Sequence, residues 1–344
     1  MVAELFVINS LSGVKYYFFK FTRLLIFFIL GNLLTLVLFY RRMTILRLTS
    51  LLITFMSLSL HVSSQENGYE ELQLTNDAFI NRYSSYNKDG TKILFESNRD
   101  SIWQIYTMNA DGTNQKRLIK TRHNDRRPTW HPYKDIILFE SDRVGVSELY
   151  TYDLETKRTK RIPLLLIGNK TRAQFAPNGV QIIFNLEDIN GDYDIYIVDH
   201  KGKRPEKIVD DAFKNLYPHF SPRGDNILFY SNKNNEGESD VIYTYNIITE
   251  KRSRLTYFKD HSNDPMWSNS RTKIAYVATV DNEGPEIYIM QSDGKNKKRI
   301  TFNDHIESLP NWSPDDKNLL VTRYIKGTEQ IFKILLDKPL EEDK

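Results

Sequence analysis

Short apolar runs separated by polar turns recur along the chain from about residue 70 onward. One recurring phrase reads Q-I-Y-T-M-N, E-L-Y-T-Y-D, D-I-Y-I-V-D, V-I-Y-T-Y-N, E-I-Y-I-M-Q and Q-I-F-K-I-L, with its central ring at Tyr106, Tyr150, Tyr196, Tyr243, Tyr288 and Phe332. These residues are 44, 46, 47, 45 and 44 positions apart. A second aromatic series, with spacings of 44, 45, 45, 47 and 45, comprises Tyr86, Trp130, Phe175, Phe220, Trp267 and Trp312. The two series define one unit that occurs six times.

Each unit is predicted to consist of strands alone. An apolar run such as I-L-F-E-S lies between the two aromatic series, and a basic segment such as K-R-L-I or K-R-I-T follows the Tyr phrase. The segments are rich in Ile, Tyr, Val and Phe and are bounded by tight turns such as Asp111-Gly112 and Asn178-Gly179. No convincing helical period occurs after residue 65. Four antiparallel strands in about 45 residues are typical of one propeller blade.

The basic segments predict how the ring of blades closes. Six Tyr-type phrases are followed by only five basic segments, and Leu72-Gln73-Leu74-Thr75 has the pattern of the missing one. The sequence therefore predicts an all-β, six-bladed β-propeller over residues 65–344. Its blades have four strands, and an N-terminal strand at about 70–76 completes the last blade and removes the open edges. Lys and Arg on the outermost strands are interpreted as protection against edge pairing, with an electrostatic docking site as the alternative.

Two stretches of the repeat are specific enough to be compared with known families. They read L-P-N-W-S-P-D-D-K-N-L-L-V-T and I-L-F-E-S-N-R-D-S-I-W-Q-I-Y-T-M-N-A-D-G-T-N-Q-K-R-L. Units of this kind resemble the WD-like repeat of TolB-type propellers, over roughly residues 70–337. The resemblance implies a propeller outside the cytoplasm; in the Tol–Pal system, the TolB propeller binds a peptidoglycan-associated lipoprotein. TolB also has an N-terminal α/β domain, for which the interval from Gln65 to Leu72 is too short, so a Tol–Pal role is not implied.

Residues 1–64 are predicted to form a hydrophobic leader. Leu24 to Tyr40 is an almost wholly apolar run of 17 residues with cationic residues on both sides, which is short for a membrane span. A second segment starts at Met43 and has the cationic start, the apolar stretch and the small residues of a secretory signal, with cleavage expected before Gln65.

Two interpretations of this leader remain open. In the favoured one, residues 43–64 are a signal peptide and residues 1–42 are an upstream extension. In the other, translation starts at Met1 and the leader is a membrane anchor. Both place the rest of the chain across a membrane, as a periplasmic or secreted protein. A third alternative, a buried helical hairpin, is disfavoured because the region is far more apolar than the rest of the chain.

Charge and cysteine content exclude several classes of function. The formal net charge is +3, but the leader holds six cations and one anion, so the other 280 residues carry about two more anions than cations. A nucleic-acid partner is therefore not expected. The absence of cysteine excludes disulfides, thiolate metal sites, a cysteine nucleophile and a lipoprotein anchor.

Catalytic motifs are absent from the sequence. No G-x-S-x-G, H-E-x-x-H, P-loop or G-x-G-x-x-G pattern occurs. One segment resembles a calcium loop in its alternating oxygen side chains, Asp188, Asn190, Asp192 and Asp194. It lacks a bidentate Glu at its far end and lies where other units have ordinary polar turns, so calcium is kept only as a weak hypothesis and no other cofactor is expected.

Polar residues in the loops between blades form the candidate site. His123, His261 and His305 each precede the Pro of the next unit by four or five residues, in loops expected to meet around one mouth of the channel. The full candidate set is His123, Asp125, Arg127, Arg172, Asp260, His261, Asp304 and His305. Such a cluster could bind a metal or an acidic group, or these residues could simply bond the loop backbone. Because His123 is expected across the ring from His261, we expect a polar recognition surface rather than a three-histidine metal site.

The resulting functional hypothesis is a non-enzymatic binding or scaffold module. Its expected partner is an envelope protein or a glycan, it is expected to be a monomer, and it should contact a membrane only through the leader. The alternative is a carbohydrate-active enzyme, similar to a polysaccharide lyase, with its site at the channel mouth.

Overall fold

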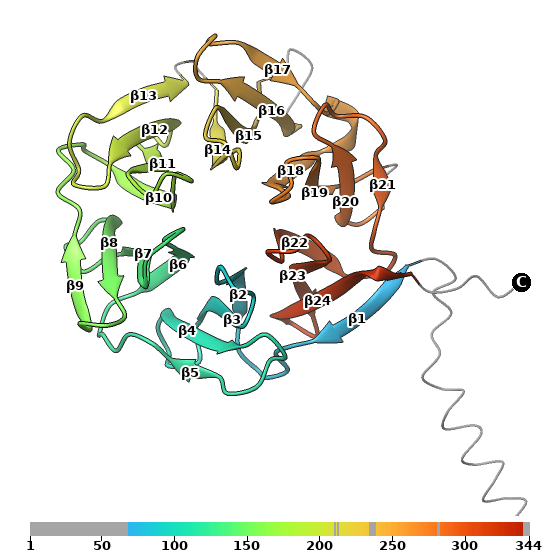
Figure 1. The fold of residues 1–344 in the computed structure, drawn as a ribbon, viewed down its shortest axis with the longest axis horizontal. Helices are drawn as coiled ribbons and strands as arrows, with labels where there is room; N and C mark the ends of the chain where they lie inside the picture. Colours follow the sequence, from blue (N-terminus) through green and yellow to red (C-terminus); the bar gives the residue numbers. More distant parts are fainter. Residues whose placement is uncertain (1–67, 210, 212, 234–238, 281–282, 340–344) are drawn as a thin grey trace, which may run out of the picture. The chain divides into compact units, whose positions relative to one another are not determined.

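The computed structural model describes residues 68–339 except residues 210, 212, 234–238 and 281–282. The predicted leader and both interpretations of it lie outside the described residues. The described chain forms six four-stranded antiparallel sheets arranged as a ring (Figure 1). This confirms the all-β, six-bladed propeller predicted from the repeat. None of the described residues belongs to a helix with the length and hydropathy of a membrane span.

The four strand positions of a blade correspond to the four segments of the repeat. The inner strands, which surround the channel, are β2 (Asn81–Tyr86), β6 (Asp125–Trp130), β10 (Asn169–Phe175), β14 (Asn215–Phe220), β18 (Ser262–Trp267) and β22 (Ile306–Trp312). The second strands, which carry the apolar run, are β3 (Lys92–Ser97), β7 (Ile136–Ser141), β11 (Gln181–Glu187), β15 (Asn226–Ser231), β19 (Lys273–Ala278) and β23 (Asn318–Ile325). The third strands, which carry the Tyr phrase, are β4 (Gln104–Asn109), β8 (Glu148–Asp153), β12 (Tyr193–Asp199), β16 (Val241–Asn246), β20 (Glu286–Gln291) and β24 (Thr328–Pro339). The outermost strands are β5 (Lys116–Arg117), β9 (Arg158–Arg161), β13 (Glu206–Val209), β17 (Arg252–Arg254), β21 (Lys298–Arg299) and β1 (Tyr69–Gln73).

The last blade combines the two ends of the described chain. Strand β1 pairs antiparallel with β24, and Gln73 lies opposite Phe332. Beyond the strand, the Leu74 N–H donates to the Ile331 carbonyl at 2.8 Å, and the Ile331 N–H donates to the Thr75 hydroxyl oxygen at 2.9 Å. The predicted closing strand is therefore confirmed, and closure leaves no inner or middle strand of this blade unpaired.

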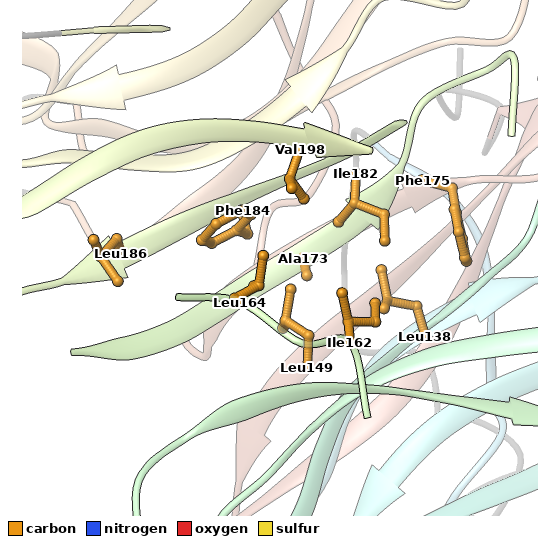
Figure 2. Close-up of a cluster of buried hydrophobic side chains, with 10 residues drawn as sticks. All are labelled: Leu138, Leu149, Ile162, Leu164, Ala173, Phe175, Ile182, Phe184, Leu186 and Val198. Atoms are coloured by element: carbon orange, nitrogen blue, oxygen red, sulfur yellow. The ribbon is translucent and has the colours of Figure 1, made fainter. Parts of the chain in front are cut away.

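The hydrophobic core lies in layers between neighbouring blades. Figure 2 shows one such layer, between the blade of β6–β9 and the blade of β10–β13, with buried side chains at Leu138, Leu149, Ile162, Leu164, Ala173, Phe175, Ile182, Phe184, Leu186 and Val198. Second strands have a neighbouring blade on both faces, which explains why they are apolar at successive positions instead of alternating. Each blade therefore depends on its neighbours for burial of its apolar surface.

The outermost strands form the rim of the ring. Their cations pair with carboxylates of the same blade, as Arg117 does with Asp100 at 2.8 Å and Lys207 with Asp194 at 3.0 Å. Such exposed pairs contribute little stability, about 0–1 kcal/mol each. They are consistent with edge protection, which stays an interpretation.

A β-bulge interrupts the pairing of every inner strand with its second strand. At each bulge one non-glycine residue has a positive φ: Tyr83, Arg127, Arg172, Tyr217, Asp264 and Leu309, with φ of 54°, 44°, 53°, 60°, 46° and 55°. Bulky side chains rarely adopt this backbone conformation, and bulges commonly redirect a side chain next to a functional site. These six bulge residues determine the chemistry of the channel.

Candidate binding site in the channel

The channel contains a cavity of about 420 Å³. Its lining comes from the second half of all six inner strands and from turns that lead into the second strand, and it includes every bulge residue except Asp264. We call this side of the ring the first-hairpin face. The opposite side, where an outermost strand leads into the inner strand of the next blade, is the crossover face. The cavity therefore opens toward the first-hairpin face.

Two tyrosines meet across the channel at the depth of the bulges. Tyr83 belongs to the first blade and Tyr217 to the fourth, which lie on opposite sides of the six-membered ring. Their ring centroids are 6.4 Å apart and their planes differ by only 14°. The stacked pair therefore narrows the channel and forms the floor of the cavity.

Two arginines flank the stacked tyrosines. The Cζ atom of Arg127 lies 5.2 Å from the Tyr83 ring centroid, and that of Arg172 lies 5.3 Å from the Tyr217 ring centroid. Both distances fit cation–π contacts, which stabilise a partly desolvated guanidinium. The floor of the cavity thus combines two aromatic rings with two positive charges.

The buried Glu140 carboxylate contacts both arginines, the side chain of Arg127 and the backbone of Arg172. Glu140 accepts a hydrogen bond from the Arg127 guanidinium at 2.6 Å and another from the backbone N–H of Arg172 at 2.5 Å. Burial raises the pKa of Glu140, an effect that the positive charge of Arg127 opposes. The carboxylate offsets the charge of Arg127, whereas the Arg172 guanidinium makes no ion pair with any described residue.

Polar atoms without a protein partner are concentrated around the cavity. Among the described residues, half of the buried side-chain nitrogen and oxygen atoms that lack a hydrogen-bond partner belong to residues that line it. They are Ser84 Oγ, Ser85 Oγ, Tyr86 Oη, Arg127 Nε, Arg172 Nε, His219 Nε2 and Trp267 Nε1. Buried polar atoms are almost always hydrogen-bonded, so such a concentration points to a surface that binds a ligand or ordered water.

Two titratable side chains complete the channel lining. Burial lowers the pKa of His219 to about 3, so this imidazole is neutral near neutral pH and adds no charge. Its Nδ1 bonds to the side-chain amide of Gln174, which also donates to the Pro218 carbonyl at 2.7 Å. Burial raises the pKa of Asp264, a bulge residue, to about 6, an effect that the charge of Arg172 opposes.

The structure separates the residues of the sequence-based candidate site. Arg127 and Arg172 lie together in the channel, as described above. His123, His261 and His305 lie in crossover loops between the first and second, the fourth and fifth, and the fifth and sixth blades, respectively. In a ring of six blades, the junction of the first and second blades lies opposite the junction of the fourth and fifth blades. His123 therefore lies across the ring from His261. The histidines therefore face away from the cavity, and the proposed recognition surface on the crossover face stays a prediction.

The crossover loops use their polar residues largely to fix the backbone. The His123 N–H donates to the Thr121 hydroxyl, and the His305 N–H donates to the Asn303 side chain at 2.9 Å. Asp125 is fully buried and binds Arg143 at 2.7 Å.

Acidic residues of the remaining crossover loops lie beside the other two histidines. Asp260 lies 3.8 Å from the Lys297 ammonium. Asp304 lies in the same loop as His305. These contacts give Asp125 and Asp260 a structural role.

The weak calcium candidate forms a tight hairpin. The Asp188 carboxylate accepts the backbone N–H groups of Asn190 at 2.8 Å and Asp192 at 3.0 Å, and Asp194 pairs with Lys207 of the outermost strand. No group of three or more His, Asp or Glu side chains within the described part of the chain is placed to share an ion. Calcium binding at this hairpin stays a prediction without support from these contacts.

Tyr83, Tyr217, Asp264 and Leu309 were not predicted from the sequence, although a signal for them exists. Every bulge residue stands three positions before a member of the second aromatic series. A further register, beyond the two aromatic series and the apolar run, was therefore available in the repeat. Its residue types differ from blade to blade, so hydrophobic patterning gives no indication of it.

Sequence comparisons identify the repeat. The family described as the TolB beta propeller domain matches residues 185–339. The TolB homolog of Chlorobium chlorochromatii is 30% identical over 41% of this chain and 30% of its own length. The Tol-Pal system protein TolB of Bordetella pertussis is 27% identical over 42% of this chain and 32% of its own length. The chain carries a TolB-like β-propeller. An uncharacterized peptidase of Bacillus subtilis, YuxL, is also 26% identical over 33% of this chain and 18% of its own length.

Solved structures share the TolB-like propeller fold at low sequence identity. A putative TolB from Agrobacterium tumefaciens has a TM-score of 0.62 at 15% identity and covers 78% of this chain and 98% of its own. TolB from Acinetobacter baumannii has a TM-score of 0.56 at 20% identity, with 70% and 61% covered. An oligogalacturonate lyase in complex with manganese has a TM-score of 0.55 at 14% identity, with 79% and 94% covered. These likenesses establish the fold alone. The chain spans less than a third of the length of the curated relatives named above.

Proposed function

We propose that this TolB-like propeller is a non-enzymatic binding module that works outside the cytoplasm and holds part of an envelope protein or glycan in its channel cavity. The observation that carries the proposal is the concentration of unpartnered buried polar atoms around this one cavity. A purely structural channel would favour apolar or mutually bonded side chains there, because an unpartnered buried polar atom costs about 1–3 kcal/mol.

The size and chemistry of the cavity fit this role. Ligand sites are typically concave, about 300–1,000 Å³ in volume, and combine aromatic walls with a few polar groups. The cavity here has about 420 Å³, with Trp130, Trp267 and Phe175 among its walls and Arg172 at its floor.

Location outside the cytoplasm is supported by the predicted signal at residues 43–64 and by the relatives named as Tol-Pal system proteins. N-terminal mass spectrometry of the native protein tests the location. We expect the mature chain to begin near Gln65. Peptides from residues 5–20 in the mature protein would instead favour the membrane-anchored interpretation.

A cavity-filling variant tests the binding role. Asn311 lines the cavity, and Asn311→Trp should fill part of it without removing a hydrogen bond described in this structure. Val180 lies on the first-hairpin face outside the cavity lining and is 51% exposed, so Val180→Trp is the matched control. We expect the wild type and the control to retain the same component of an envelope extract and Asn311→Trp to lose it, with similar melting temperatures for all three. Equal retention by all three proteins would contradict binding in the cavity.

The enzyme alternative is tested with the same variants. Acidic oligosaccharides are incubated with each protein, and unsaturated products of chain cleavage are followed by absorbance. Cleavage by the wild type and Val180→Trp, but not by Asn311→Trp, would contradict the non-enzymatic binding role and would indicate that the protein is a lyase.

A further inference from the structure

Arg172 differs from the other largely buried arginines of the propeller. Those arginines have a carboxylate partner at short distance: Arg82 with Glu96 at 2.9 Å, Arg127 with Glu140 at 2.6 Å, Arg143 with Asp125 at 2.7 Å, Arg252 with Asp211 at 2.6 Å and Arg323 with Glu307 at 2.5 Å. No described carboxylate lies within 4 Å of the Arg172 guanidinium, and its buried Nε has no hydrogen-bond partner. An arginine stays charged at any physiological pH, so this guanidinium is available to pair with an anion from outside the protein.

Neither buried carboxylate near the channel floor forms an ion pair with the Arg172 guanidinium. The Arg172 charge acts on the pKa of Asp264, but that carboxyl is not within 4 Å of the guanidinium. One oxygen of Glu140 accepts the Arg172 backbone N–H, and the other accepts the Arg127 guanidinium. Both oxygens of Glu140 are therefore already bonded. The floor of the cavity retains a guanidinium without an ion-pair partner among the described residues, beside the Tyr217 ring.

We propose that the floor of the cavity is a carboxylate site, formed by Arg172 with Arg127 beside the stacked Tyr83 and Tyr217, that holds the C-terminal carboxylate of a peptide. This inference rests on the proposed function, because it names the ligand group that enters the same cavity. A planar guanidinium fork binds a carboxylate through two parallel N–H···O bonds, which is stronger and more selective than contact with a neutral amide.

The stacked tyrosines favour a chain end over the middle of a chain. Their ring centroids are only 6.4 Å apart across the channel, so a polymer that enters from the first-hairpin face cannot pass between them. A chain end can therefore reach Arg172, whereas an extended chain cannot continue past it. A peptide carries a carboxylate at its terminus whatever its sequence.

The walls favour a peptide over a sugar. The indole N–H of Trp130 donates to the Ser85 carbonyl and that of Trp312 to the Met266 carbonyl, both at 3.2 Å, so these rings are held in the contacts between blades. A pyranose ring stacks on an exposed aromatic face, whereas Trp312 is only 4% exposed and Trp130 is half-buried. Hydroxyl groups of the lining that have no partner, those of Ser84, Ser85 and Tyr86, can instead bond the peptide backbone.

Two synthetic peptide pools test the site. Both contain N-acetylated random pentapeptides and differ only in a C-terminal carboxylate or a C-terminal amide. Each pool is equilibrated with the purified protein, and retained peptides are quantified by mass spectrometry. We expect the carboxylate pool to be retained about 10- to 100-fold more strongly, as for a charge-assisted bidentate contact.

Arg172→Met should abolish this preference, because it removes the unpaired charge. Arg223 is exposed, lies on the same face and does not line the cavity, so Arg223→Met makes the same change of charge elsewhere and should keep the preference. If Arg172→Met fails to fold, Arg172→Lys takes its place. It keeps the charge without the guanidinium fork, and we expect it to reduce the preference.

The outcomes separate this inference from the proposed function. Equal retention of both pools, abolished by Asn311→Trp, would overturn the carboxylate site and leave the binding role intact. A carboxylate preference that survives Arg172→Met would also overturn the site. Retention of a trigalacturonate in an Arg172-dependent manner, with no peptide retained, would overturn the assignment to a peptide. Failure of every probe to bind would count against both proposals.

Discussion

The two halves of each inner strand differ in how many buried polar atoms they leave without a partner. Among the described residues there are three before the bulge, Arg126 Nε, Thr171 Oγ1 and Glu307 Oε2, and five after it. Before the bulge, on the side of the crossover face, Asp125 and Glu307 are each bound by an arginine of their own blade. After the bulge, on the side of the first-hairpin face, Ser85, His219 and Trp267 each keep a buried polar atom without a partner. Both halves lie at similar depth in the fold. Polar groups in the first half therefore fix the strands and loops of their own blade, whereas those in the second half are available to a ligand.

In the first half of the inner strands, the same position carries a buried polar residue in all six blades. This position lies two residues before the bulge residue. The first buried residue of each inner strand is polar and makes at least one hydrogen bond, namely Asn81, Asp125, Lys170, Asn215, Ser262 and Glu307. A satisfied buried network makes one packing arrangement specific, and removal of a single partner leaves the others uncompensated. Such contacts should be sensitive to mutation, in contrast to the cavity.

The largest expected effect follows from breaking the network before the bulge. Arg323 is 7% exposed in its side chain and binds both Glu307 of the inner strand and Glu71 of the closing strand. Arg323→Met should lower the free energy of unfolding by about 3–5 kcal/mol, because it leaves the buried Glu307 carboxylate unpaired. Urea unfolding followed by fluorescence measures the loss. A loss no greater than that of the exposed control Arg223→Met would remove the distinction between the two halves.

A second variant, Arg172→Met, tests the part of the inner strands that lines the cavity. Arg172 is also largely buried, but no carboxylate is paired with it directly, and its charge acts only at longer range on the pKa of Asp264. Arg172→Met should therefore change the free energy of unfolding by no more than about 1 kcal/mol, and a gain is allowed because an unpaired buried charge is costly. The same urea series provides the measurement. A loss similar to that of Arg323→Met would show that Arg172 is structural, and the carboxylate site would lose its basis.

The repeat predicted the architecture because strand spacing and apolar runs are recorded directly in the sequence. Blade number, strand order and the closing role of Leu72 to Thr75 followed from three registers that agree over six copies. The bulges could not be predicted in this way. A positive φ at Tyr83 or Leu309 is imposed by the ring of neighbouring blades, since neither residue type favours that conformation.

The candidate site was predicted only in part for the same reason. Arg127 and Arg172 were predicted because they follow the crossover loops closely in sequence, but their depth in the channel depends on the bulge. The histidines also occupy different loop positions. His123 and His305 stand two residues before the first buried polar residue of the inner strand, and His261 stands one residue before it. The three histidines stand at similar distances, four or five residues, before the next proline, so the sequence spacing did not reveal this difference.

Asp264 gives a smaller, pH-dependent effect on the cavity side. Burial and the Asp240 charge raise its pKa to about 6, and the Arg172 charge opposes this; Tyr217 and Tyr230 also face it. The ordinary value is about 3.9, so the folded state binds this proton more tightly than the unfolded state does. The contribution of Asp264 to stability is therefore greatest below about pH 4, falls as the pH rises to about 6, and is constant above it.

Asp264→Asn should remove this pH-dependent contribution. We expect the melting temperature of the variant to rise relative to that of the wild type between about pH 4 and pH 6. Melting curves over this range measure the difference. If the difference in melting temperature between the two proteins does not vary with pH, the Asp264 carboxyl is ionised over this whole pH range. Its charge is then stabilised by a partner when the protein is in solution.

The smallest expected effect concerns the crossover face. His261 and His305 lie in neighbouring crossover loops, and their contacts are few: His261 Nε2 lies 3.2 Å from the Ser239 hydroxyl, and the His305 backbone is fixed by Asn303. Replacing both histidines with Ala should change the free energy of unfolding by no more than about 0.5 kcal/mol, because exposed loop side chains seldom contribute more. The sequence-based hypothesis predicts that the double variant binds an envelope partner more weakly, whereas the cavity proposal predicts unchanged retention of the carboxylate peptide pool. Both measurements on the same variant decide which face binds: weaker capture of the envelope partner with unchanged peptide retention would establish a second surface, and loss of peptide retention would contradict the separation of the two faces.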